Sequence, residues 1–325
     1  MKCLVTGGAG FIGSHLVDRL LAKGHKVICV DNFDPYYPRE LKKNNLALAV
    51  NNKRFTLYEA DICNLPRLDG IFRKHKIDTV IHLAAKAGVQ PSLKDPLSYE
   101  RTNVYGTLNV LEAMRKNSVN RLIFASSSSV YGRKNKVPFK ETAVCDSPPS
   151  PYAATKRAAE ILIYTYHNLF GIKATILRFF NAYGPRNRPD MALPKFSAKI
   201  INHQPITAYR GTRRDYTYID DIVSGIVAAI NKPFEYKIIN LGHHEPVPIR
   251  DYIRTLENAL GIKAKITVAD LPPGEMVETM ADISKAKKFL RYNPKTSLEE
   301  GVTKFVTWAK NNSDLFKPEA VRTQS

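Results

Sequence analysis

Tyr152 and Lys156 stand four residues apart where the proline-rich loop Ser147–Pro151 leads into a helical segment, Pro151–Phe170. Residues at this spacing share one face of a helix, so the phenol and the ammonium can point into one site. A free tyrosine has a pKa of about 10 and is a poor base at neutral pH. A nearby lysine cation favours the phenolate and so lowers the pKa of the tyrosine. The pair predicts proton transfer to and from an alcohol.

Serine hydroxyls cluster upstream, in Ala125-Ser-Ser-Ser-Ser-Val-Tyr-Gly132, at the end of an expected strand Leu122–Ala125. Ligands bind at the carboxyl edge of open α/β sheets, so these hydroxyls are placed to hydrogen-bond the reacting alcohol. A tyrosine and a lysine four apart are common by chance. The pair becomes informative because it follows the serine cluster and a nucleotide-binding motif.

That motif consists of Gly7, Gly10 and Gly13, which follow a short apolar strand and lead into the amphipathic run Ser14–Leu21. The first glycine allows a tight turn, the second lets backbone N–H groups approach a pyrophosphate, and the third lets the helix pack close to the strand. The helix N-terminus adds a partial positive charge that faces the phosphates. The spacing predicts a dinucleotide site.

Asp31 indicates which dinucleotide this is. It ends the expected strand Lys26–Val30, about 20 residues beyond the glycines, where a carboxylate accepts hydrogen bonds from the ribose hydroxyls. A carboxylate there repels a 2′-phosphate, so NAD is favoured over NADP. The alternative is a structural turn followed by a surface aspartate. The positive charge of an oxidised nicotinamide would further favour the Tyr152 phenolate.

Strand-like and helix-like stretches alternate through the first half of the chain, which predicts an α/β fold with a doubly wound parallel sheet of the Rossmann type. After Asp31 we expect a polar loop, Asn32–Arg39, and a helical stretch to about Val50. The further expected strands are Arg54–Tyr58, Thr79–Leu83, Leu122–Ala125 and Ala174–Leu177.

Beyond Arg178 the elements become shorter and richer in Pro, Gly, Arg and Tyr, which predicts a smaller α/β substrate lobe. Ile238–Leu241 is apolar enough to return to the main sheet after a helix Ile219–Ile230, so the lobe is expected to be discontinuous. The predicted NAD-binding domain is residues 1–178 plus about 219–247, and the lobe is about 179–218 plus 248–325. The polar tail after about Lys317 is expected to fray.

The composition restricts the class of protein. With 325 residues, 44% of them hydrophobic, the chain can bury a full core. No apolar run approaches the roughly 20 residues of a membrane span, and the first residues form a strand instead of a signal peptide, so a cytoplasmic protein with no membrane partner is expected. The cysteines show no C-x-x-C spacing and are expected to be neither metal ligands nor disulfide partners; they are Cys3, Cys29, Cys63 and Cys145.

The formal net charge of +19 admits a nucleic acid, an anionic membrane surface or an anionic substrate as a partner. The lysines and arginines are scattered along the chain, with no basic tail and no long block of like charge. We therefore expect a solvated basic surface that steers acidic nucleotides, and no nucleic-acid partner.

Together these motifs resemble the extended short-chain dehydrogenase/reductase family over nearly the whole chain. The matching features are Gly7-x-x-Gly10-x-x-Gly13, Asp31-Asn32, Asp61-Ile62, Ala84-Ala85-Lys86, the serine cluster, Tyr152-x-x-x-Lys156, Arg178-Phe-Phe-Asn181 and Arg214-Asp-Tyr-Thr-Tyr-Ile-Asp220. The resemblance implies an NAD-dependent enzyme that acts on a nucleotide sugar.

The resemblance also implies roles for single residues. Tyr152 is implied to be the acid/base, Lys156 to hold the nicotinamide ribose, and Ser127 to be the catalytic hydroxyl. Asp61 and Ile62 are implied to contact the adenine. The implied cofactor-binding residues are Gly7, Gly10, Phe11, Ile12, Gly13, Asp31, Asn32, Asp61, Ile62, Leu83, Ala84, Ala85, Lys86, Asn103, Tyr152 and Lys156. The implied substrate-binding residues are Lys86, Ser127, Ser128, Ser129, Tyr152, Asn181, Arg188, Arg214 and Thr279, and no metal is implied.

A homodimer is implied as well, through two helices of each subunit, here Pro96–Lys116 and Pro151–Phe170. Apolar positions in these helices can serve that interface or face the sheet. They are Leu108, Val110, Leu111, Ile161 and Leu162.

Within the family, three segments look most like the UDP-glucuronate 4-epimerases: Asp31–Tyr37, Gly184–Ala192, and Pro273-Gly274 leading into Ala281-Asp282. The implied reaction converts UDP-glucuronate to UDP-galacturonate through a transient 4-keto sugar. An extra arginine beside the sugar would pair with its carboxylate through a bidentate hydrogen bond, and Arg188 is the candidate. A phosphate or surface role for Arg188 is the alternative.

Other reactions and substrates remain open. The family's dehydratases and decarboxylases carry acidic residues just after the catalytic Ser or Thr, where this chain has Ser128 and Ser129, so epimerisation is favoured. Asn181 stands where glucuronate epimerases usually carry Thr, and Gln90 where they often carry Arg. A UDP-glucose 4-epimerase, acting on a neutral hexose, is therefore the alternative.

Two further questions stay open at the level of sequence. Some members of this fold bind RNA, which is a remote alternative because the catalytic set is intact and no nucleic-acid motif is present. In the lobe, Tyr209, Tyr216 and Tyr218 either stack on the uracil or fill the interior.

Overall fold

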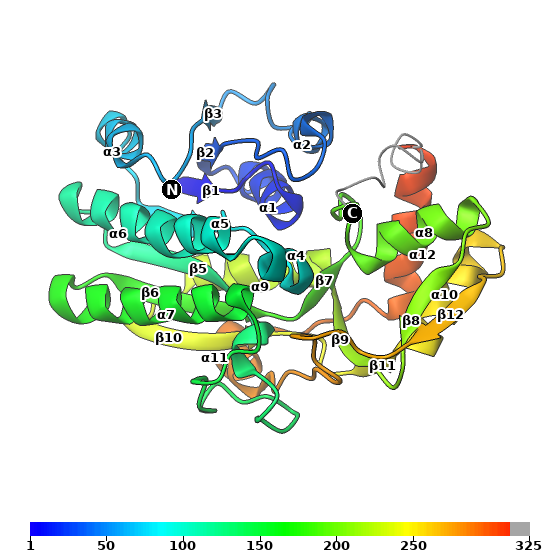
Figure 1. Cartoon of the computed structure of the whole chain (residues 1–325). Helices are drawn as coiled ribbons and strands as arrows, with labels where there is room; N and C mark the ends of the chain where they lie inside the picture. Colours follow the sequence, from blue (N-terminus) through cyan, green and yellow to red (C-terminus); the bar gives the residue numbers. More distant parts are fainter. Residues whose placement is uncertain (313–325) are drawn as a thin grey trace.

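The computed structural model describes residues 1–312, and within them seven strands form one parallel sheet in the order β10-β6-β5-β4-β1-β2-β3 (Figure 1). The strands are β1 (Lys2–Thr6), β2 (Lys26–Asp31), β3 (Phe55–Glu59), β4 (Thr79–His82), β5 (Arg121–Ser127), β6 (Lys173–Phe179) and β10 (Tyr236–Leu241). The predicted doubly wound sheet is confirmed. The strand order reverses between β1 and β4, which opens a crevice at their carboxyl ends.

Helices cover both faces of this sheet. One face is covered by α3 (Leu65–Lys74), α6 (Gly106–Lys116) and α7 (Pro151–Phe170), which bury their apolar stripes in one core cluster. The other face is covered by α1 (Phe11–Ala22), α9 (Ile219–Asn231) and α11 (Ser284–Leu290), which pack in a second cluster. Because the central strands are buried on both faces, they are continuous apolar runs instead of alternating ones.

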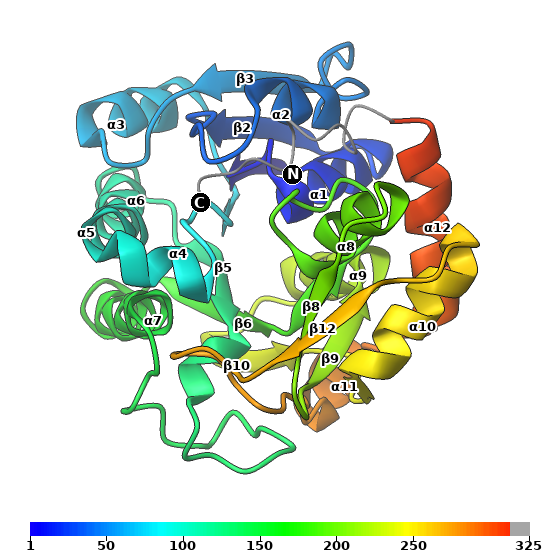
Figure 2. The ribbon, with the colours of Figure 1, turned by 45° about the vertical axis from the view of Figure 1, so that its right-hand side comes forward.

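The smaller lobe lies beside the carboxyl edge of the main sheet (Figure 2). It contains a sheet of β7 (Asn181–Tyr183), β9 (Arg213–Tyr218) and β11 (Pro246–Pro248), and a pair of β8 (Ile206–Tyr209) and β12 (Ile266–Ala269). Its helices are α8 (Ala192–Ile201), α10 (Ile249–Leu260) and α12 (Leu298–Lys310). The chain leaves this lobe to form α9 and β10 and then returns, and the limits of the two domains stay a prediction. The predicted fraying after about Lys317 lies outside the described residues.

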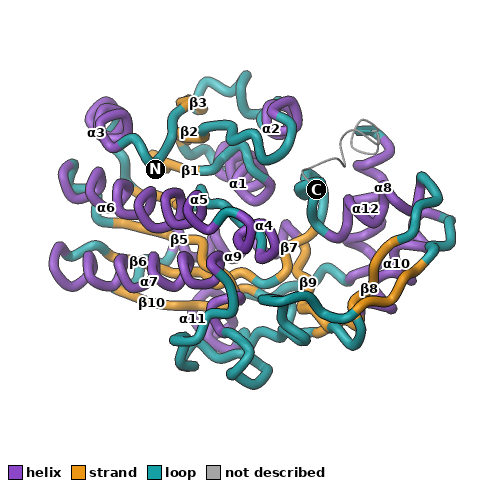
Figure 3. Tube along the Cα trace, in the orientation of Figure 1, coloured by secondary structure: helices purple, strands orange, loops and turns teal. Residues whose placement is uncertain are grey.

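Two segments differ from the sequence expectation. The helix α2 (Arg39–Asn45) ends before Val50, because Leu46 and Ala49 turn into the core and the chain tightens into successive turns. The expected helix Pro96–Lys116 is divided into α5 (Pro96–Glu100), a π-helical turn η1 (Arg101–Tyr105) and α6. A short helix, α4 (Val89–Lys94), precedes α5. Another, η2 (Ser128–Tyr131), precedes the long loop 132–150, which is teal in Figure 3.

A buried carboxylate joins the elements that carry the candidate catalytic residues. Glu160 of α7 accepts hydrogen bonds from Ser126 of β5 (2.6 Å) and from Arg178 of β6 (2.9 and 2.7 Å). Arg157 also reaches it, at 3.0 Å. Glu160 and Arg178 are 0% and 1% exposed. Burial alone would raise the pKa of Glu160, but the hydrogen bonds and charge of Arg178 hold that pKa below its ordinary value.

The Arg178 guanidinium also lies 4.7 Å from the centre of the Tyr131 ring. The Tyr131 hydroxyl in turn donates to Asn240 of β10 (2.6 Å). The ends of β5, β6, β10 and α7 are therefore fastened together at the carboxyl edge of the sheet. None of the helices in the described residues has the length and apolar character needed to cross a membrane.

Arg178→Met should destabilise the fold by about 3 to 5 kcal/mol, because it leaves a buried carboxylate without its bidentate partner. Lys173 at the start of the same strand pairs with Glu235 on the surface, so Lys173→Met should cost less than about 1 kcal/mol. Urea unfolding of both variants measures the difference. Equal losses in the two variants would contradict the importance of the Glu160 network.

Candidate active site

The glycine turn after β1 leaves no room for side chains. Gly7 has φ +71°, and a Cβ added to it would lie 2.7 Å from the backbone nitrogen of Ala84. A Cβ on Gly13 would lie 2.1 Å from the carbonyl oxygen of Gly7, and one on Gly10 would lie 3.3 Å from it. Phe11 and Ile12 open α1 directly behind this turn. The bare backbone at a helix N-terminus fits the predicted pyrophosphate of a dinucleotide.

Asp31 fastens this turn to the end of β2. Its carboxylate accepts the backbone N–H of Ala9 (3.0 Å) and of Phe33 (2.9 Å). Burial raises the pKa of Asp31, and these hydrogen bonds oppose that effect. Asn32 and Asp61, two further predicted cofactor residues, are neighbours as well, because the Asn32 amide donates to the Asp61 carboxylate at 3.3 Å. Ile62, which follows Asp61, is buried. The predicted ribose and adenine residues therefore gather along the ends of β2 and β3.

The segment Leu83–Lys86 follows β4 and packs directly against the glycine turn at Gly7. Its four residues, including Ala84 and Ala85, are partly exposed. Asn103 holds this segment, because its side chain accepts the N–H of Lys86 (2.8 Å) and donates to the Lys86 carbonyl (2.9 Å) and to Thr155 of α7 (3.0 Å). The π-helical turn presents Asn103 in this position, as such turns often do at functional sites.

His82 extends this polar network through the core. Its Nδ1 lies 2.7 Å from the Thr6 hydroxyl, and its Nε2 lies 3.0 Å from the Thr107 hydroxyl. Because Thr107 donates its own proton to the Asn103 carbonyl (2.6 Å), the histidine must donate from Nε2 and accept at Nδ1. Burial lowers the pKa of His82 to about 3, and the charge of Lys156 acts in the same direction. A neutral histidine thus links the strand before the glycine turn to Asn103.

The three predicted catalytic residues meet at the ends of β5 and α7. Ser150 caps α7 by accepting the N–H of Ala153 (3.2 Å), which places Tyr152 in the first helical turn. Ser127 begins η2, and its hydroxyl accepts the N–H of Ser129 (3.1 Å). The Ser127 hydroxyl also contacts the Tyr152 phenol, an interaction that favours the phenolate. Ser128 is buried beside them.

The source of positive charge on Tyr152 differs from the sequence expectation. The Lys156 ammonium donates to the Ala125 carbonyl (2.8 Å) and lies 5.0 Å from the centre of the Phe124 ring. Burial lowers the pKa of Lys156 to about 7, against the opposing charge of Glu160. Burial raises the pKa of Tyr152, while Ser127 and the charge of Arg188 lower it. Among the side chains described, the cation that acts on Tyr152 is therefore Arg188.

Arg188 comes from the loop after β7 and reaches the same site. Its Nη2 and the Tyr99 hydroxyl both donate to the carbonyl of Ala87, at 3.2 and 3.1 Å. The Tyr99 ring meets the Tyr152 ring edge to face, with 6.2 Å between ring centres. The guanidinium of Arg188 is bound to Asp190 through Nε (3.0 Å) and Nη2 (2.7 Å). The predicted carboxylate-binding arginine is thus close to the predicted catalytic tyrosine and already paired with a carboxylate.

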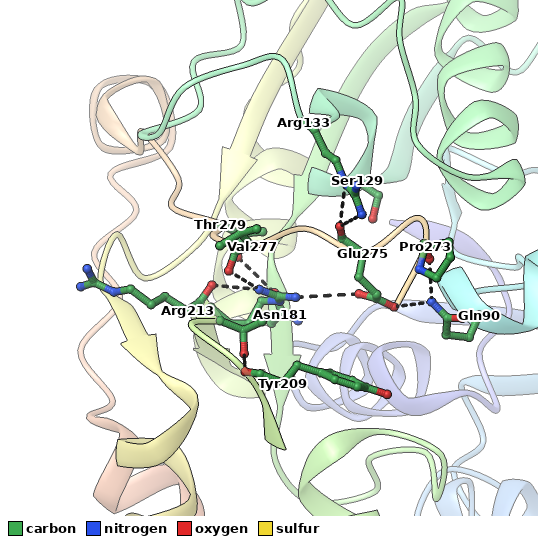
Figure 4. Close-up of polar contacts among 12 residues, drawn as sticks. Gln90, Ser129, Arg133, Asn181, Tyr209, Arg213, Pro273, Glu275, Val277 and Thr279 are labelled. Atoms are coloured by element: carbon green, nitrogen blue, oxygen red, sulfur yellow. Dashed lines mark hydrogen bonds and ion pairs between the residues drawn. The ribbon is translucent and has the colours of Figure 1, made fainter. Parts of the chain in front are cut away.

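The remaining substrate candidates line the other side of the crevice (Figure 4). Thr279 lies 3.4 Å from the Asn181 side chain and also accepts the N–H of Asp215 (3.2 Å). Arg214 donates to the carbonyls of Arg213 (3.1 Å) and Val277 (2.9 Å). Burial lowers the pKa of Arg214 below its ordinary value.

Glu275 connects both lobes across this side of the crevice. Its carboxylate lies 3.8 Å from Arg214 and 3.3 Å from the Gln90 amide, and Figure 4 shows it reaching toward Gln90. Arg133 donates to the backbone carbonyl of Glu275 at 2.9 and 2.7 Å. Gln90 also donates to the Pro273 carbonyl (3.0 Å), so the segment around Pro273 lies across the site.

The lobe tyrosines divide into two kinds. Tyr216 stacks on Tyr252 with 4.2 Å between ring centres, and Tyr218 is buried against Tyr183. Both fill the lobe. Tyr209 is 36% exposed, so its ring can contact a base.

Sequence reasoning missed Glu275, Asp190 and Tyr99. Asp190 lay inside a segment that had been singled out, and Glu275 directly follows Pro273-Gly274, but no spacing rule gives either a partner. Tyr99 carried no signal, because its place beside Tyr152 results from the packing of α5 on α7.

Comparison with known proteins agrees with this geometry. Residues 3–242 match the family described as the NAD dependent epimerase/dehydratase family. A UDP-glucuronate 4-epimerase of Thermodesulfobacterium geofontis is 44% identical over 317 residues, which cover 97% of this chain and 98% of that protein. A UDP-glucuronate 4-epimerase of Arabidopsis thaliana is 40% identical over 325 residues, covering 94% of this chain and 74% of that protein.

Solved structures give the same result. The UDP-glucuronic acid 4-epimerase of Bacillus cereus in complex with UDP-glucuronic acid and NAD has a TM-score of 0.91 and 40% identity, covering 96% of this chain and 100% of that one. The UDP-glucose 4-epimerase of Thermotoga maritima with UDP-glucose has a TM-score of 0.88 and 32% identity, covering 96% of this chain and 100% of that one.

The neutral state of His82 makes stability depend on pH. Its pKa is about 3 in the folded chain and 6.5 when unperturbed, so between these values the unfolded chain binds more protons and the fold loses stability as pH falls. Between pH 7.0 and 5.5 this loss should be about 1 kcal/mol for His82. Between pH 7.0 and 5.5 the free energy of unfolding of His82→Gln, measured in urea, should therefore fall by about 1 kcal/mol less than that of the unmodified protein. A charged His82 ring at pH 5.5 in nitrogen-15 NMR would contradict the assignment.

Proposed function

The chain belongs to the NAD dependent epimerase/dehydratase family, and we propose that it is a UDP-glucuronate 4-epimerase that forms UDP-galacturonate. One observation carries the proposal: the Arg188 guanidinium lies in the site of Tyr152. Among the described side chains, it is the cation that lowers the pKa of the Tyr152 phenol. A site for a neutral hexose has no need of such a cation. The relatives named UDP-glucuronate 4-epimerase support the same substrate.

The proposed proton transfers follow from the positions of Ser127 and Tyr152. The Tyr152 phenolate takes the proton of the 4-hydroxyl and, as the phenol, later returns it, while the Ser127 hydroxyl holds the reacting oxygen. When bound, NAD⁺ supplies a hydride acceptor that takes the hydrogen of carbon 4 and gives it back on the other face. Lys156, whose ammonium is fixed by the Ala125 carbonyl, is proposed to hold the nicotinamide ribose.

Cofactor binding is proposed on the residues that line the crevice. The glycine turn Gly7–Gly13 takes the pyrophosphate, Asp31 and Asn32 the ribose, Asp61 and Ile62 the adenine, and Leu83–Lys86 with Asn103 the nicotinamide side. The space at the glycines and the fixed segment after β4 support this arrangement. On the substrate side, Asn181 and Arg214 are proposed to bind the nucleotide half, and Thr279 to pack against the sugar ring.

The serines after Ser127 bear on the outcome of the reaction. In a 4-keto glucuronate the ketone is β to the carboxylate, an arrangement prone to losing carbon dioxide. Ser128 and Ser129 supply hydroxyls where a decarboxylase or dehydratase of this family would place an acid. We therefore propose that these serines and Arg188 hold the carboxylate without assisting its loss.

A second substrate is favoured by one observation. The side chain of Asn181 lies beside Thr279 and presents an amide where glucuronate epimerases usually have Thr. An amide hydrogen-bonds a neutral sugar as well as an acidic one. UDP-glucose is therefore the second candidate, in line with the similarity to the Thermotoga maritima UDP-glucose 4-epimerase.

The proposed homodimer would use the outer face of α5 and α7, which lie side by side in Figure 1. Large apolar residues of these two helices are exposed: Leu97 (80%), Ile161 (51%), Tyr164 (50%), Leu169 (67%) and Phe170 (47%). Val110 and Leu111 are fully buried against the sheet, so these two interface candidates are excluded, while Leu108 and Leu162 are partly exposed. Large exposed apolar residues on one face are typical of protein interfaces.

A cytoplasmic location is the last part of the proposal. All four cysteines lie in the described part of the chain and are free thiols, with Cys3, Cys29 and Cys145 buried. Free thiols are typical of proteins kept in a reducing compartment.

The proposed reaction is tested by incubating the purified protein separately with UDP-glucuronate and with UDP-glucose, without added cofactor, and resolving the sugar protons by NMR. UDP-galacturonate should form. Tyr152→Phe should lower the rate by about 100-fold or more, because it removes the proton acceptor and keeps the ring. Tyr166→Phe, in the same helix but bonded to Glu112, is the control and should stay within a few fold of the unmodified protein. Conversion of UDP-glucose alone would select the neutral substrate instead.

The dimer is tested by placing a charge on its proposed face. Ile161→Glu should convert a dimer to a monomer in analytical ultracentrifugation, because a carboxylate would be buried without a partner. Val268→Glu in β12 is the control, since Val268 is 48% exposed but lies on the smaller lobe. A dimer that survives Ile161→Glu, or an unmodified protein that is monomeric, would contradict this interface.

A further inference from the structure

Two segments that lie far apart in the sequence meet at the Asp190 carboxylate. One is Asp31–Tyr37, and its Tyr36 hydroxyl donates to Asp190 Oδ2 at 3.1 Å. The other is Gly184–Ala192, in which Arg188 binds both oxygens of Asp190. The Tyr36 ring also lies under the guanidinium, 5.3 Å from Arg188 Cζ to the ring centre. None of these contacts takes part in the proton transfer proposed above.

Counting donors shows what this arrangement leaves for a ligand. An arginine has five N–H groups. In Arg188, Nε and Nη2 are taken by Asp190 and the Ala87 carbonyl. Its Nη1 makes no hydrogen bond with any residue in the range 1–312, and it is not among the fully buried polar atoms that lack a partner. Of the three nitrogens of the guanidinium, Nη1 is therefore the one left for a ligand.

The Arg188–Asp190 pair is largely removed from solvent. The exposed fractions of the two side chains are 17% and 19%. Burial alone would lower the pKa of Arg188, but Asp190, with smaller contributions from Tyr36 and Tyr37, raises it above its ordinary value. The arginine is thus kept charged, and a bidentate carboxylate fixes its orientation more tightly than a single hydrogen bond.

We propose that Asp190, supported by Tyr36, is a positioning residue that aims the Nη1 edge of Arg188 at the sugar and so sets the preference for an acidic sugar over a neutral one. This inference rests on the proposed function, because it assigns a specificity to the same site. A sugar carboxylate needs a donor at a fixed place, whereas a neutral hydroxymethyl group gains little from Arg188. Loss of the orientation should therefore affect the acidic substrate selectively.

The test compares KM and kcat for UDP-glucuronate and UDP-glucose in Asp190→Asn. The variant keeps the size of the side chain and removes the charge that holds both Nε and Nη2. We expect KM for UDP-glucuronate to rise about tenfold, a loss of about 1.4 kcal/mol, with kcat changed less and the values for UDP-glucose within about twofold. Tyr36→Phe, which removes the one hydroxyl that supports Asp190, should give a smaller shift in the same direction.

Binding is measured as well, by calorimetry with UDP-glucuronate in the Tyr152→Phe background, where turnover is blocked. The dissociation constant should rise with Asp190→Asn as KM does. The control is Asp18→Asn, which breaks an ion pair of the same length (2.7 Å) and similar burial between α1 and Arg186 of the same segment. It should leave the ratio of the two KM values unchanged.

The possible outcomes separate the inference from the function on which it rests. An unmodified protein that does not convert UDP-glucuronate would overturn the proposed function. If that conversion occurs, three results would show that the positioning role of Asp190 is wrong. Asp190→Asn could raise KM equally for both substrates, it could lower the dissociation constant for UDP-glucuronate, or it could have the same KM ratio as Asp18→Asn. Circular dichroism and thermal unfolding verify that each variant is folded, and Tyr36→Phe provides the test if Asp190→Asn does not fold.

Discussion

The Glu160 carboxylate is the constraint on which the geometry of this site depends. It is bound by Ser126, Arg157 and Arg178, so one buried charge joins β5, β6 and α7. Ser126 lies between Ala125, whose carbonyl holds Lys156, and Ser127, which contacts Tyr152. A shift of α7 along the sheet would break these bonds together. Breaking a buried ion pair is strongly destabilising, so the pair favours one position of the helix even where it adds little net stability.

A second network links the cofactor side of the crevice to the same helix. It runs from Thr6, just before the glycine turn, through His82 and Thr107 to Asn103, and from Asn103 to Thr155 of α7. Each group has a defined role as donor or acceptor, and such satisfied buried networks fix one arrangement of the core. The segment Leu83–Lys86 and the helix that carries Tyr152 are therefore positioned by one set of hydrogen bonds.

The sequence was sufficient to predict the elements but not the pairing of their side chains. Apolar runs predicted the strands because the central ones are buried on both faces, and Ser150-Pro151 marked the start of α7. The spacing of Tyr152 and Lys156 predicted a shared face, yet Lys156 turns to the Ala125 carbonyl, because a buried ammonium needs an acceptor that spacing cannot reveal. Likewise, Arg188 was predicted as a carboxylate ligand, but its pairing with Asp190 follows from a loop conformation that has no periodic signal.

Arg188 connects sugar recognition with the proton chemistry. Its charge favours the phenolate of Tyr152, and its Nη1 edge is the one proposed to meet the sugar carboxylate. A bound carboxylate would offset part of that charge and leave less of it to act on the phenol. Asp190 also offsets part of that charge, whether or not a sugar is bound, and its bidentate contact fixes the orientation of the guanidinium. One cation can therefore serve both recognition of the sugar carboxylate and the proton chemistry of Tyr152, because Asp190 holds it in one place.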